Sequence, residues 1–307
     1  MLDNYQDEYV LRIHKVQDYI EQNYHKSMTT EELSEVAGFS KYHFNRIFKS
    51  VLKEPLSHYV NRIRMEHAVF MLAHRQDRNI TDIALDLGFT DSAVFSRAFK
   101  NYYGISPNVY RKKYSINEKE NIFISAYNKP EKKKKWVNPP FPETGQIRLE
   151  RMEELQVVYV RHTGNYRSLA REYPRLMRNL FRLSSKQKLW KPGENMVLAM
   201  YHDNPEFGAK EQFRTSLCMT YPRSCTAKEE GMLGIMTIEG GLYAVGHFEI
   251  KKEQFEDAWD YMYQQWLMTS GYVPRNASPF EVYLNNPKRE KNHLIKVDIY
   301  VPIAPIK

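Results

Sequence analysis

Cysteine is almost absent from this chain of 307 residues, which contains only Cys218 and Cys225. Neither has a neighbouring His or Cys partner, and this argues against a disulfide framework and against a structural zinc site. Long apolar runs are also missing, since none approaches the roughly 20 residues needed to cross a bilayer. The segment Met1–Val10 carries three acidic residues and lacks the apolar stretch of a secretory signal. These absences predict a cytoplasmic protein with no membrane partner.

Basic residues, in contrast, are in excess. The chain has 45 Lys and Arg residues against 37 Asp and Glu residues, a formal net charge of +8 with a pI near 9.1. Because Lys and Arg release counterions when they contact phosphates, this balance favours a polyanionic partner. Many proteins of similar charge bind no nucleic acid, so nucleic-acid binding has to be judged from sequence motifs.

Length and one irregular segment predict two domains. A single core rarely grows beyond about 250–300 residues. Residues 128–145 contain four prolines, the run Lys132–Lys135 and no apolar periodicity, which is typical of a linker. The lysine run is either a solvated charged stretch or a phosphate contact. We predict a first domain at 1–114, a linker at 115–145 and a second domain at 146–307.

The first domain contains an internal repeat. Segments Glu31–Val60 and Thr81–Tyr110 share a Gly-Phe step and, after one inserted residue, a common pattern of Phe, Arg, Phe, Lys and Tyr. Each copy fits two short helices joined by a tight turn, a helix-turn-helix unit. The matching residues are Phe44, Arg46, Phe48, Lys49 and Tyr59 in the first copy and Phe95, Arg97, Phe99, Lys100 and Tyr110 in the second.

Local signals place the ends of these helices. Thr29 and Glu32 have the spacing of a capping box. Gly38 and Gly88 stand where the first helix of each copy must end, in a backbone conformation that favours glycine. The N-caps of the second helices are predicted at Ser40 in the first copy and at Thr90 or Asp91 in the second.

The second helix of each copy has one apolar face, which predicts core packing, and one polar face. On the polar faces, Arg and Asn suit guanine and adenine, and small residues allow close approach in the major groove. Arg46 and Arg97 could instead form ion pairs with the acidic first helices. The candidate DNA-binding residues are Tyr42, Asn45, Arg46 and Lys49 in the first copy and Ser92, Ala93, Ser96, Arg97 and Lys100 in the second.

One continuous helix is predicted between the copies, over Leu56–Ala73. Eighteen residues at about 1.5 Å each span roughly 27 Å. A rod of this order could place both second helices about one DNA turn, or about 34 Å, apart on the same side of a duplex. The DNA site is expected to be asymmetric, because the two polar faces differ.

The stretch IALDLGFTDSAVFSRAFKNYYGISPNVYR, Ile83–Arg111, resembles the AraC/XylS family of bacterial transcription regulators. The resemblance extends over about Glu8–Lys113. It implies two helix-turn-helix units, with base contacts from Tyr42, Asn45 and Arg46 in the first and from Ser92, Ala93, Ser96 and Arg97 in the second. At Lys53 the family usually has a glycine, and this departure predicts a local change in the turn.

The second domain alternates strands and helices. Strands are predicted near Ile147 and over Val157–Arg161, followed by an amphipathic helix through Leu169 and Leu180. The same order recurs with strands at Ile235–Ile238 and Tyr243–Phe248 and a helix through Phe255, Trp259 and Met262, and two further strands close the chain. We therefore predict a multidomain protein: an all-α double helix-turn-helix domain, then an α+β domain with a pseudo-two-fold repeat.

This second domain resembles the GyrI-like effector-binding domains over Gln146–Ile303. The matching motifs are His162–Tyr166, Tyr201–Pro205, Tyr243–Val245, Phe280–Leu284 and Asp298–Ile303. The resemblance implies a cleft in which a glutamate, here Glu281, attracts cationic ligands. The second half lacks the usual Gly-Pro-Tyr turn and has His247-Phe248-Glu249 instead, which predicts a different wall on that side of the cleft.

The composition of the second domain suits such a cleft. All four tryptophans and nine of the thirteen methionines lie after residue 130, and such side chains form adaptable walls or ordinary core. Glu281 stands between apolar neighbours and needs a partner if it is buried, although the wet face of a strand is the alternative. The candidate ligand-binding residues are Tyr166, Trp259, Tyr263, Glu281 and Tyr283.

Three functions are weighed. The leading one is a regulator, expected to be an activator, that binds double-stranded DNA and RNA polymerase and is tuned by a small amphipathic or cationic effector. The second domain could instead be a small-molecule hydrolase, in which a Glu with a nearby Tyr activates water, or a ligand-free protein-interaction module. No nucleophile elbow, metal-ligand cluster or phosphate-binding glycine loop is apparent in the sequence, so we expect no enzyme activity, no metal and no cofactor.

Overall fold

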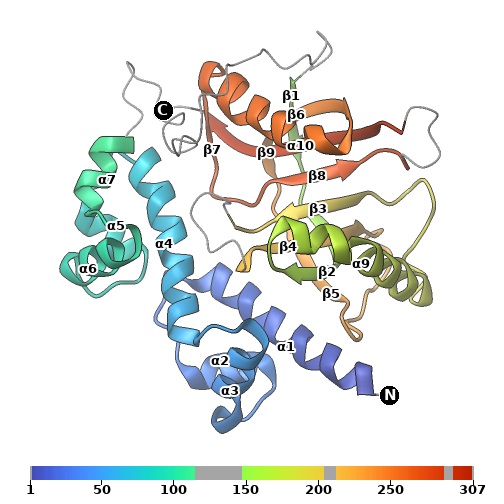
Figure 1. The fold of residues 1–307 in the computed structure, drawn as a ribbon, viewed down its shortest axis with the longest axis horizontal. Coiled ribbons are helices and arrows are strands. Elements are labelled where there is room, and N and C mark those ends of the chain that lie inside the picture. Colours follow the sequence, from blue (N-terminus) through green and yellow to red (C-terminus); the bar gives the residue numbers. More distant parts are fainter. Residues whose placement is uncertain (1, 115–146, 204–211, 287–292, 306–307) are drawn as a thin grey trace. The chain divides into compact units, whose positions relative to one another are not determined.

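The computed structural model describes residues 2–114, 147–203, 212–286 and 293–305. These residues form two compact units, a helical one before residue 115 and one built on a β-sheet after residue 146 (Figure 1). The predicted linker, with its lysine run, lies outside the described residues, so the predicted domain boundaries stay predictions. In the part of the chain that is described, no helix is both long enough and apolar enough to cross a membrane.

The helical unit packs around two hydrophobic cores. One core joins α1, α2, α3 and the first half of α4, and the other joins the second half of α4 to α5, α6 and α7. The continuous helix predicted between the repeats is confirmed as α4. The helices are α1 (Leu2–Asn23), α2 (Thr30–Ala37), α3 (Lys41–Leu52), α4 (Leu56–His74), α5 (Ile80–Asp86), α6 (Ser92–Tyr103) and α7 (Pro107–Tyr114).

Short-range signals account for most of these helix ends. The predicted capping box is confirmed, because the Thr29 side chain accepts a hydrogen bond from the Glu32 amide and the Glu32 carboxylate accepts one from the Thr29 amide. Gly38 and Gly88 have φ angles of 62° and 78°, in the left-handed region where glycine carries no steric penalty. Both helix-turn-helix units therefore turn at the predicted glycines.

The N-caps of α3 and α6 differ. Asp91 Oδ1 accepts hydrogen bonds from the amides of Ala93 and Val94, both at 2.8 Å, whereas Ser40 occupies the cap position without a side-chain bond. We expect Asp91→Ala to lower the Tm of the helical unit by about 4 °C, and Ser40→Ala to leave it almost unchanged. Thermal unfolding followed by circular dichroism at 222 nm measures both, and equal effects would contradict this account.

Lys53 ends α3 in the left-handed conformation, with a φ of 59°. Gly104 ends α6 in the same way, with a φ of 77°. The turn is therefore retained in the first copy, where lysine replaces the usual glycine. Lys53 adopts a left-handed backbone conformation that is unfavourable for a residue other than glycine. Because a Cβ atom is disfavoured there, Lys53→Gly should raise the free energy of unfolding by about 0.5–1 kcal/mol. Urea denaturation measures the free energy of unfolding, and a lower value for Lys53→Gly than for the wild-type chain would contradict this prediction.

The second unit is built on an antiparallel sheet whose strands do not follow one another in sequence order. Among the described residues its strands run β1-β6-β9-β8-β3-β4-β2-β5, with β7 paired to β9. The predicted strands are confirmed, while β3, β4 and β7 were not predicted. The pseudo-two-fold repeat stays a prediction. The strands are β1 (Ile147–Met152), β2 (Leu155–Thr163), β3 (Val197–Tyr201), β4 (Arg214–Thr220), β5 (Gly234–Ile238), β6 (Gly241–Ile250), β7 (Tyr272–Pro274), β8 (Phe280–Tyr283) and β9 (Ile295–Pro305).

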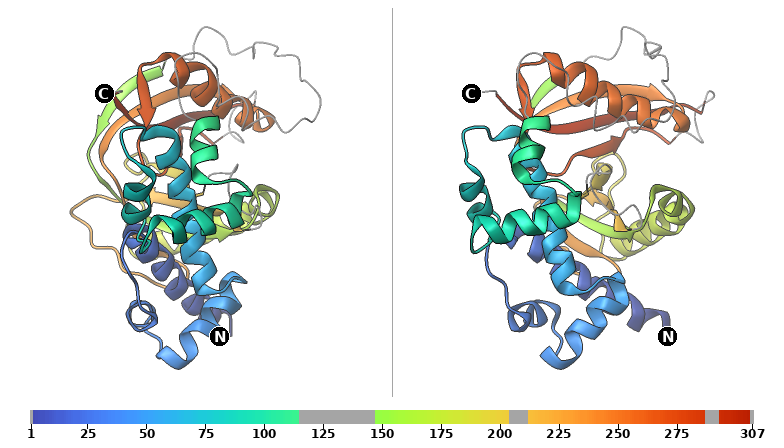
Figure 2. Two further views of the ribbon diagram at one scale, coloured as in Figure 1. Left: turned by 90° about the vertical axis from the view of Figure 1, so that its left-hand side faces the viewer. Right: turned by 60° about the vertical axis from the view of Figure 1, so that its left-hand side comes forward.

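Two helical segments cover one face of this sheet (Figures 1 and 2). The first is α9 (Tyr166–Lys186), and the second is η2 (Lys252–Gln254) with α10 (Phe255–Asp260). After α10 the chain continues through a turn of π-helix, η3 (Tyr261–Trp266), and then η4 (Leu267–Thr269). Single π-turns of this kind often occur at functional sites.

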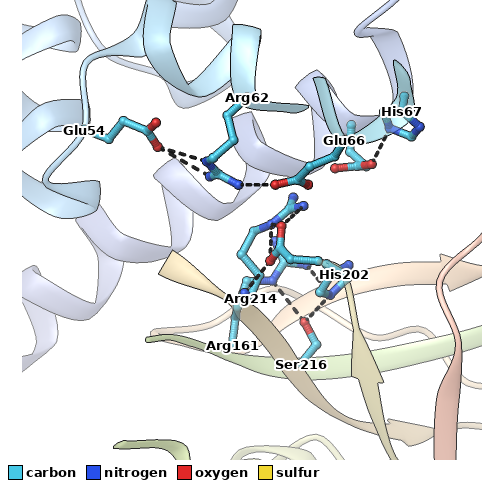
Figure 3. A network of polar contacts seen from close by, with 10 residues as sticks. Glu54, Arg62, Glu66, His67, Arg161, His202, Arg214 and Ser216 are labelled. Carbon is cyan, nitrogen blue, oxygen red and sulfur yellow. Dashed lines mark hydrogen bonds and ion pairs between the residues drawn. The ribbon is translucent and has the colours of Figure 1, made fainter. Parts of the chain in front are cut away.

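Buried arginines are held by carboxylates inside each unit (Figure 3). In the helical unit, Arg62 on α4 contacts Glu54 at 3.4 Å and Glu66 at 3.0 Å. In the sheet unit, Arg214 on β4 binds Asp203 at 2.7 Å, and both side chains are 1% exposed. Breaking such a buried pair on one side would leave an uncompensated charge, so these contacts define the local structure of each unit.

Candidate functional sites

The polar face of α3 is open to solvent. Tyr42 is 86% exposed, and Asn45, Arg46 and Lys49 are exposed beside it. On the opposite side of the helix, two phenylalanines of the first core are fully buried. Four candidate DNA-binding side chains of the first repeat thus share one accessible helix face.

The second repeat presents a similar face on α6. Ala93, Arg97 and Lys100 are exposed, whereas Ser92 and Ser96 are half-buried. This face is smaller than that of α3, since it offers no counterpart of the exposed Tyr42. The difference supports the expectation that the two halves of a DNA site are unlike.

Within the part of the chain that the structure describes, neither Arg46 nor Arg97 forms an ion pair with an acidic residue of the preceding helix. In the first repeat the Glu31 carboxylate pairs with Lys41. In the second, Asp86 pairs with Arg78 at 2.6 Å. These two carboxylates are therefore engaged by other cations, and no ion pair between either arginine and the preceding helix is formed among the described residues.

In the sheet unit, Glu281 is buried and lies on the face covered by helices. It sits on β8 between Ala199 of β3 and Ile299 of β9, and its side chain is 1% exposed. Its neighbours Phe280 and Val282 belong to the core of the opposite face, as strand alternation requires. The alternative prediction, that Glu281 lies on the solvent-facing side of its strand, is therefore wrong.

Three neutral groups donate hydrogen bonds to the Glu281 carboxylate. Trp259 donates through its indole Nε1 at 2.6 Å, and the hydroxyls of Tyr201 and Tyr283 donate at 2.9 Å each. No Lys or Arg of the described residues forms an ion pair with this carboxylate. Burial raises the pKa of Glu281 above its ordinary value, although the three hydrogen bonds oppose this rise. A buried carboxylate without a countercharge favours either a bound proton or a cationic ligand.

Aromatic rings surround this carboxylate. Tyr201 meets Trp259 edge to face at 5.7 Å between ring centroids, and Trp259 stacks on Tyr263 at 6.0 Å. Tyr166 at the start of α9 is 42% exposed and meets Tyr201 at 6.1 Å, so it stands on the solvent side of the cluster. The structure thus brings together all five candidate ligand residues. Aromatic faces attract cations, which suits the charge of the carboxylate beneath them.

Two members of this cluster escaped the sequence analysis. Tyr201 donates a hydrogen bond to Glu281, which lies 80 residues later in the sequence. In the sequence, Tyr201 was noted only as part of the motif Tyr201–Pro205. Tyr173 of α9 was not among the candidate residues; burial and the Glu281 charge raise its pKa to about 12. The same causes, with a contribution from Asp203, raise the pKa of Tyr166 to about 12. These phenols therefore remain neutral hydrogen-bond donors at physiological pH.

The segment His247-Phe248-Glu249, which stands in place of the usual Gly-Pro-Tyr turn, lies away from Glu281. His247 of β6 points to the opposite face of the sheet, where its Nδ1 meets Asp298 at 2.7 Å. Phe248 packs in the core beneath α10. The expected change in the wall of the cleft is therefore limited to the packing around Phe248.

A cavity of about 250 Å³ also lies on that opposite face of the sheet. It does not include Glu281. Its lining combines charged side chains of both signs with apolar ones. The lining residues are Glu150, Arg151, Met152, Glu153, Leu155, Met196, Phe280, Val282 and Tyr300.

Taken together, two helix-turn-helix units and a sheet domain with a buried acidic, aromatic site define a two-part protein, a helix-turn-helix region followed by an α+β domain. The chain belongs to the GyrI-like small molecule binding domain family, whose model matches residues 145–304. A helix-turn-helix domain model matches residues 33–113. Both resemblances drawn from the sequence are thereby confirmed, as is the predicted fold class of an AraC-type helix-turn-helix region and an α+β GyrI-like domain.

Several known proteins are similar to about a third of this chain. An uncharacterized HTH-type transcriptional regulator of Staphylococcus aureus is 39% identical over 100 residues, which is 33% of this chain and 13% of that protein. The lactose operon transcription activator of Staphylococcus xylosus is 34% identical over 103 residues, 34% of this chain and 37% of the activator. A solved AraC-type regulator from Chromobacterium violaceum is 24% identical, with a TM-score of 0.32, and covers 34% of this chain and 93% of its own. The chain thus spans well under half the length of these two curated relatives.

Proposed function

We propose that this protein is a transcription regulator that binds double-stranded DNA through α3 and α6. The observation that carries the proposal is the pair of accessible polar helix faces, each with an arginine in the equivalent place, Arg46 and Arg97. Tyr42, Asn45 and Lys49 on α3, with Ser92, Ala93, Ser96 and Lys100 on α6, complete the proposed contacts. Such faces enter the major groove, where Arg and Asn read base edges.

The second part of the proposal concerns the ligand. A small amphipathic cation would place its charge near Glu281 and its apolar part against the aromatic cluster of Tyr166, Trp259, Tyr263 and Tyr283. Tyr201 would hold the carboxylate in place from β3. The cation supplies the countercharge that the buried carboxylate lacks among the described residues.

The third part is the output. We infer that the protein acts on transcription in the bacterial cytoplasm by recruiting RNA polymerase, and that it activates rather than represses. Support comes from the helix-turn-helix match and from one relative that is named as an activator. We also propose that it is not an enzyme, because the Glu281 carboxylate is engaged by three donors, a poor starting point for a general base.

Selection from random duplexes, followed by mobility-shift assays with the full chain, tests DNA binding. Enrichment of an asymmetric two-part sequence is the expected result, and recovery of no motif by folded protein would refute the proposal. Tryptophan fluorescence titrated with an aryl-alkylammonium cation tests the ligand site, with a neutral analogue of the same shape as control. Turnover of a reactive ester by the full chain, lost in Glu281→Gln, would favour the hydrolase instead.

A further inference from the structure

The two helix-turn-helix units meet at the middle of α4. Up to Ile63, the buried residues of this helix pack in the first core, and from Met65 onward they pack in the second. Arg64 lies between these two sets of residues. A single helix of 19 residues sets the angle between the two cores only as far as it stays straight, because a small bend or change of twist at this point would rotate one unit against the other.

Arg64 fastens the end of α1 to this point. Its Nε donates to the Tyr24 carbonyl and its Nη2 to the Lys26 carbonyl, both at 2.9 Å. These carbonyls follow the C-terminal end of α1, where the helix dipole favours a positive charge. The planar guanidinium suits two carbonyls at once, which the single ammonium group of a lysine does not.

Tyr24 itself belongs to both cores. It packs against the buried residues of the first and of the second core. Its ring stacks on His67 of α4 at 3.8 Å between centroids, and His67 Nε2 meets Glu21 of α1 at 2.9 Å. The end of α1 therefore contacts α4 on the side of the second helix-turn-helix unit.

The turn of that second unit closes the junction. A Cβ atom at Gly88 would lie 2.8 Å from the His25 carbonyl oxygen and 2.9 Å from Arg64 Nη2, so the chain after α1 is packed directly against this turn. The Arg64 guanidinium lies 5.4 Å from the ring centroid of Phe89, the next residue. One side chain thus joins the end of α1, the middle of α4 and the turn before α6.

We propose that Arg64 is a positioning residue that holds α3 and α6 at one separation and one angle, so that the protein binds two DNA elements only at a single spacing. This inference rests on the proposed DNA-binding function. Successive major grooves recur about every 34 Å and rotate by a fixed amount per base pair, so two rigidly joined helices tolerate little variation in spacing. Arg64 makes no contact with DNA in this account and acts through α1 and α4.

The test uses duplexes that carry the two selected elements with the spacing changed by one to three base pairs, and duplexes with one element alone. The wild-type chain should show a sharp optimum. For Arg64→Ala we expect affinity at the optimal spacing to fall about 10-fold, since two hydrogen bonds that preorganise the units are lost. Affinity at other spacings and for single elements should change less than about 2-fold by the same reasoning.

Arg75→Ala is the matched control, because Arg75 follows α4 and makes an exposed ion pair with Asp77. It should leave the spacing profile unchanged. If Arg64→Ala does not fold, Tyr24→Leu keeps an apolar side chain and removes the stack on His67, and it should flatten the profile in the same way. Equal losses at every spacing and on single elements would overturn the proposal. Failure of the wild-type chain to select any element would instead reject the DNA-binding function.

Discussion

Replacing Arg46 or Arg97 by alanine is expected to weaken specific DNA binding by about 10- to 100-fold each, because a bidentate arginine contact to guanine contributes about 1–3 kcal/mol of discrimination. Both guanidinium groups are exposed, and neither is paired with a carboxylate within the described ranges of the chain. No ion pair within the described part of the chain holds either guanidinium in place, although the Asp91 carboxylate at the N-cap of α6 attracts Arg97 electrostatically. Mobility-shift titration on the selected duplex measures the loss, and salt concentration is held constant because phosphate contacts depend on it.

The pattern of the loss matters as much as its size. Arg46→Ala should relax sequence preference in one half of the selected site and Arg97→Ala in the other half. Binding to unrelated DNA should fall much less. Arg178→Ala, which removes an exposed charge from α9 in the other unit, serves as control. Equal losses of affinity for specific and unrelated DNA would show that both arginines contact phosphates and not base edges.

Glu281→Gln is expected to weaken binding of a cationic probe by about 10- to 100-fold while leaving a neutral analogue almost unaffected, since removal of a buried charge costs the cation its partner. The aromatic cluster is retained in this variant, so the apolar contribution to affinity remains. Quenching of tryptophan fluorescence reports binding, because Trp259 donates to the same carboxylate. Glu194→Gln, on an exposed ion pair with Lys191, is the matched control.

The pH dependence of this binding has a defined sign. The pKa of Glu281 lies above its ordinary value because of burial, so a proton competes with the cation over a range that begins at higher pH than for an exposed glutamate. Affinity for the cation should rise as pH increases through the raised pKa and then level off. The same titration with Glu281→Gln should be flat over this range. A wild-type profile without this rise would contradict the role given to the carboxylate.

Stability without ligand follows from the same shift. A carboxyl group with a raised pKa in the folded state contributes stability while it is protonated, and this contribution is lost as pH rises through the folded pKa. Glutamine cannot lose a proton, so Glu281→Gln should be the more stable protein above that pH. Urea denaturation of both proteins at low and neutral pH compares them, and a less stable variant at neutral pH would point to lost hydrogen bonds instead.

Much of the helical unit could be predicted because its signals are local. The capping box at Thr29 and Glu32 acts over three residues, and Gly38 and Gly88 end their helices through their own backbone conformation. The polar faces of α3 and α6 follow from a period of 3.6 residues. The N-cap of α3 was only half right, since Ser40 occupies the position without the bond, and this depends on how the turn is held by its neighbours.

The sequence by itself thus determined the two helix-turn-helix repeats and the faces that carry Arg46 and Arg97, and it singled out Glu281 as a candidate, because each is written in spacing or in a local motif. Only the tertiary structure decided that Tyr201 shares a site with Glu281 and that Arg64 meets the chain after α1, 40 residues before it. Such contacts depend on which strands become neighbours and on how helices cross. Those are properties of the packed chain, in which burial of the whole core selects one arrangement, and no short stretch of residues encodes them.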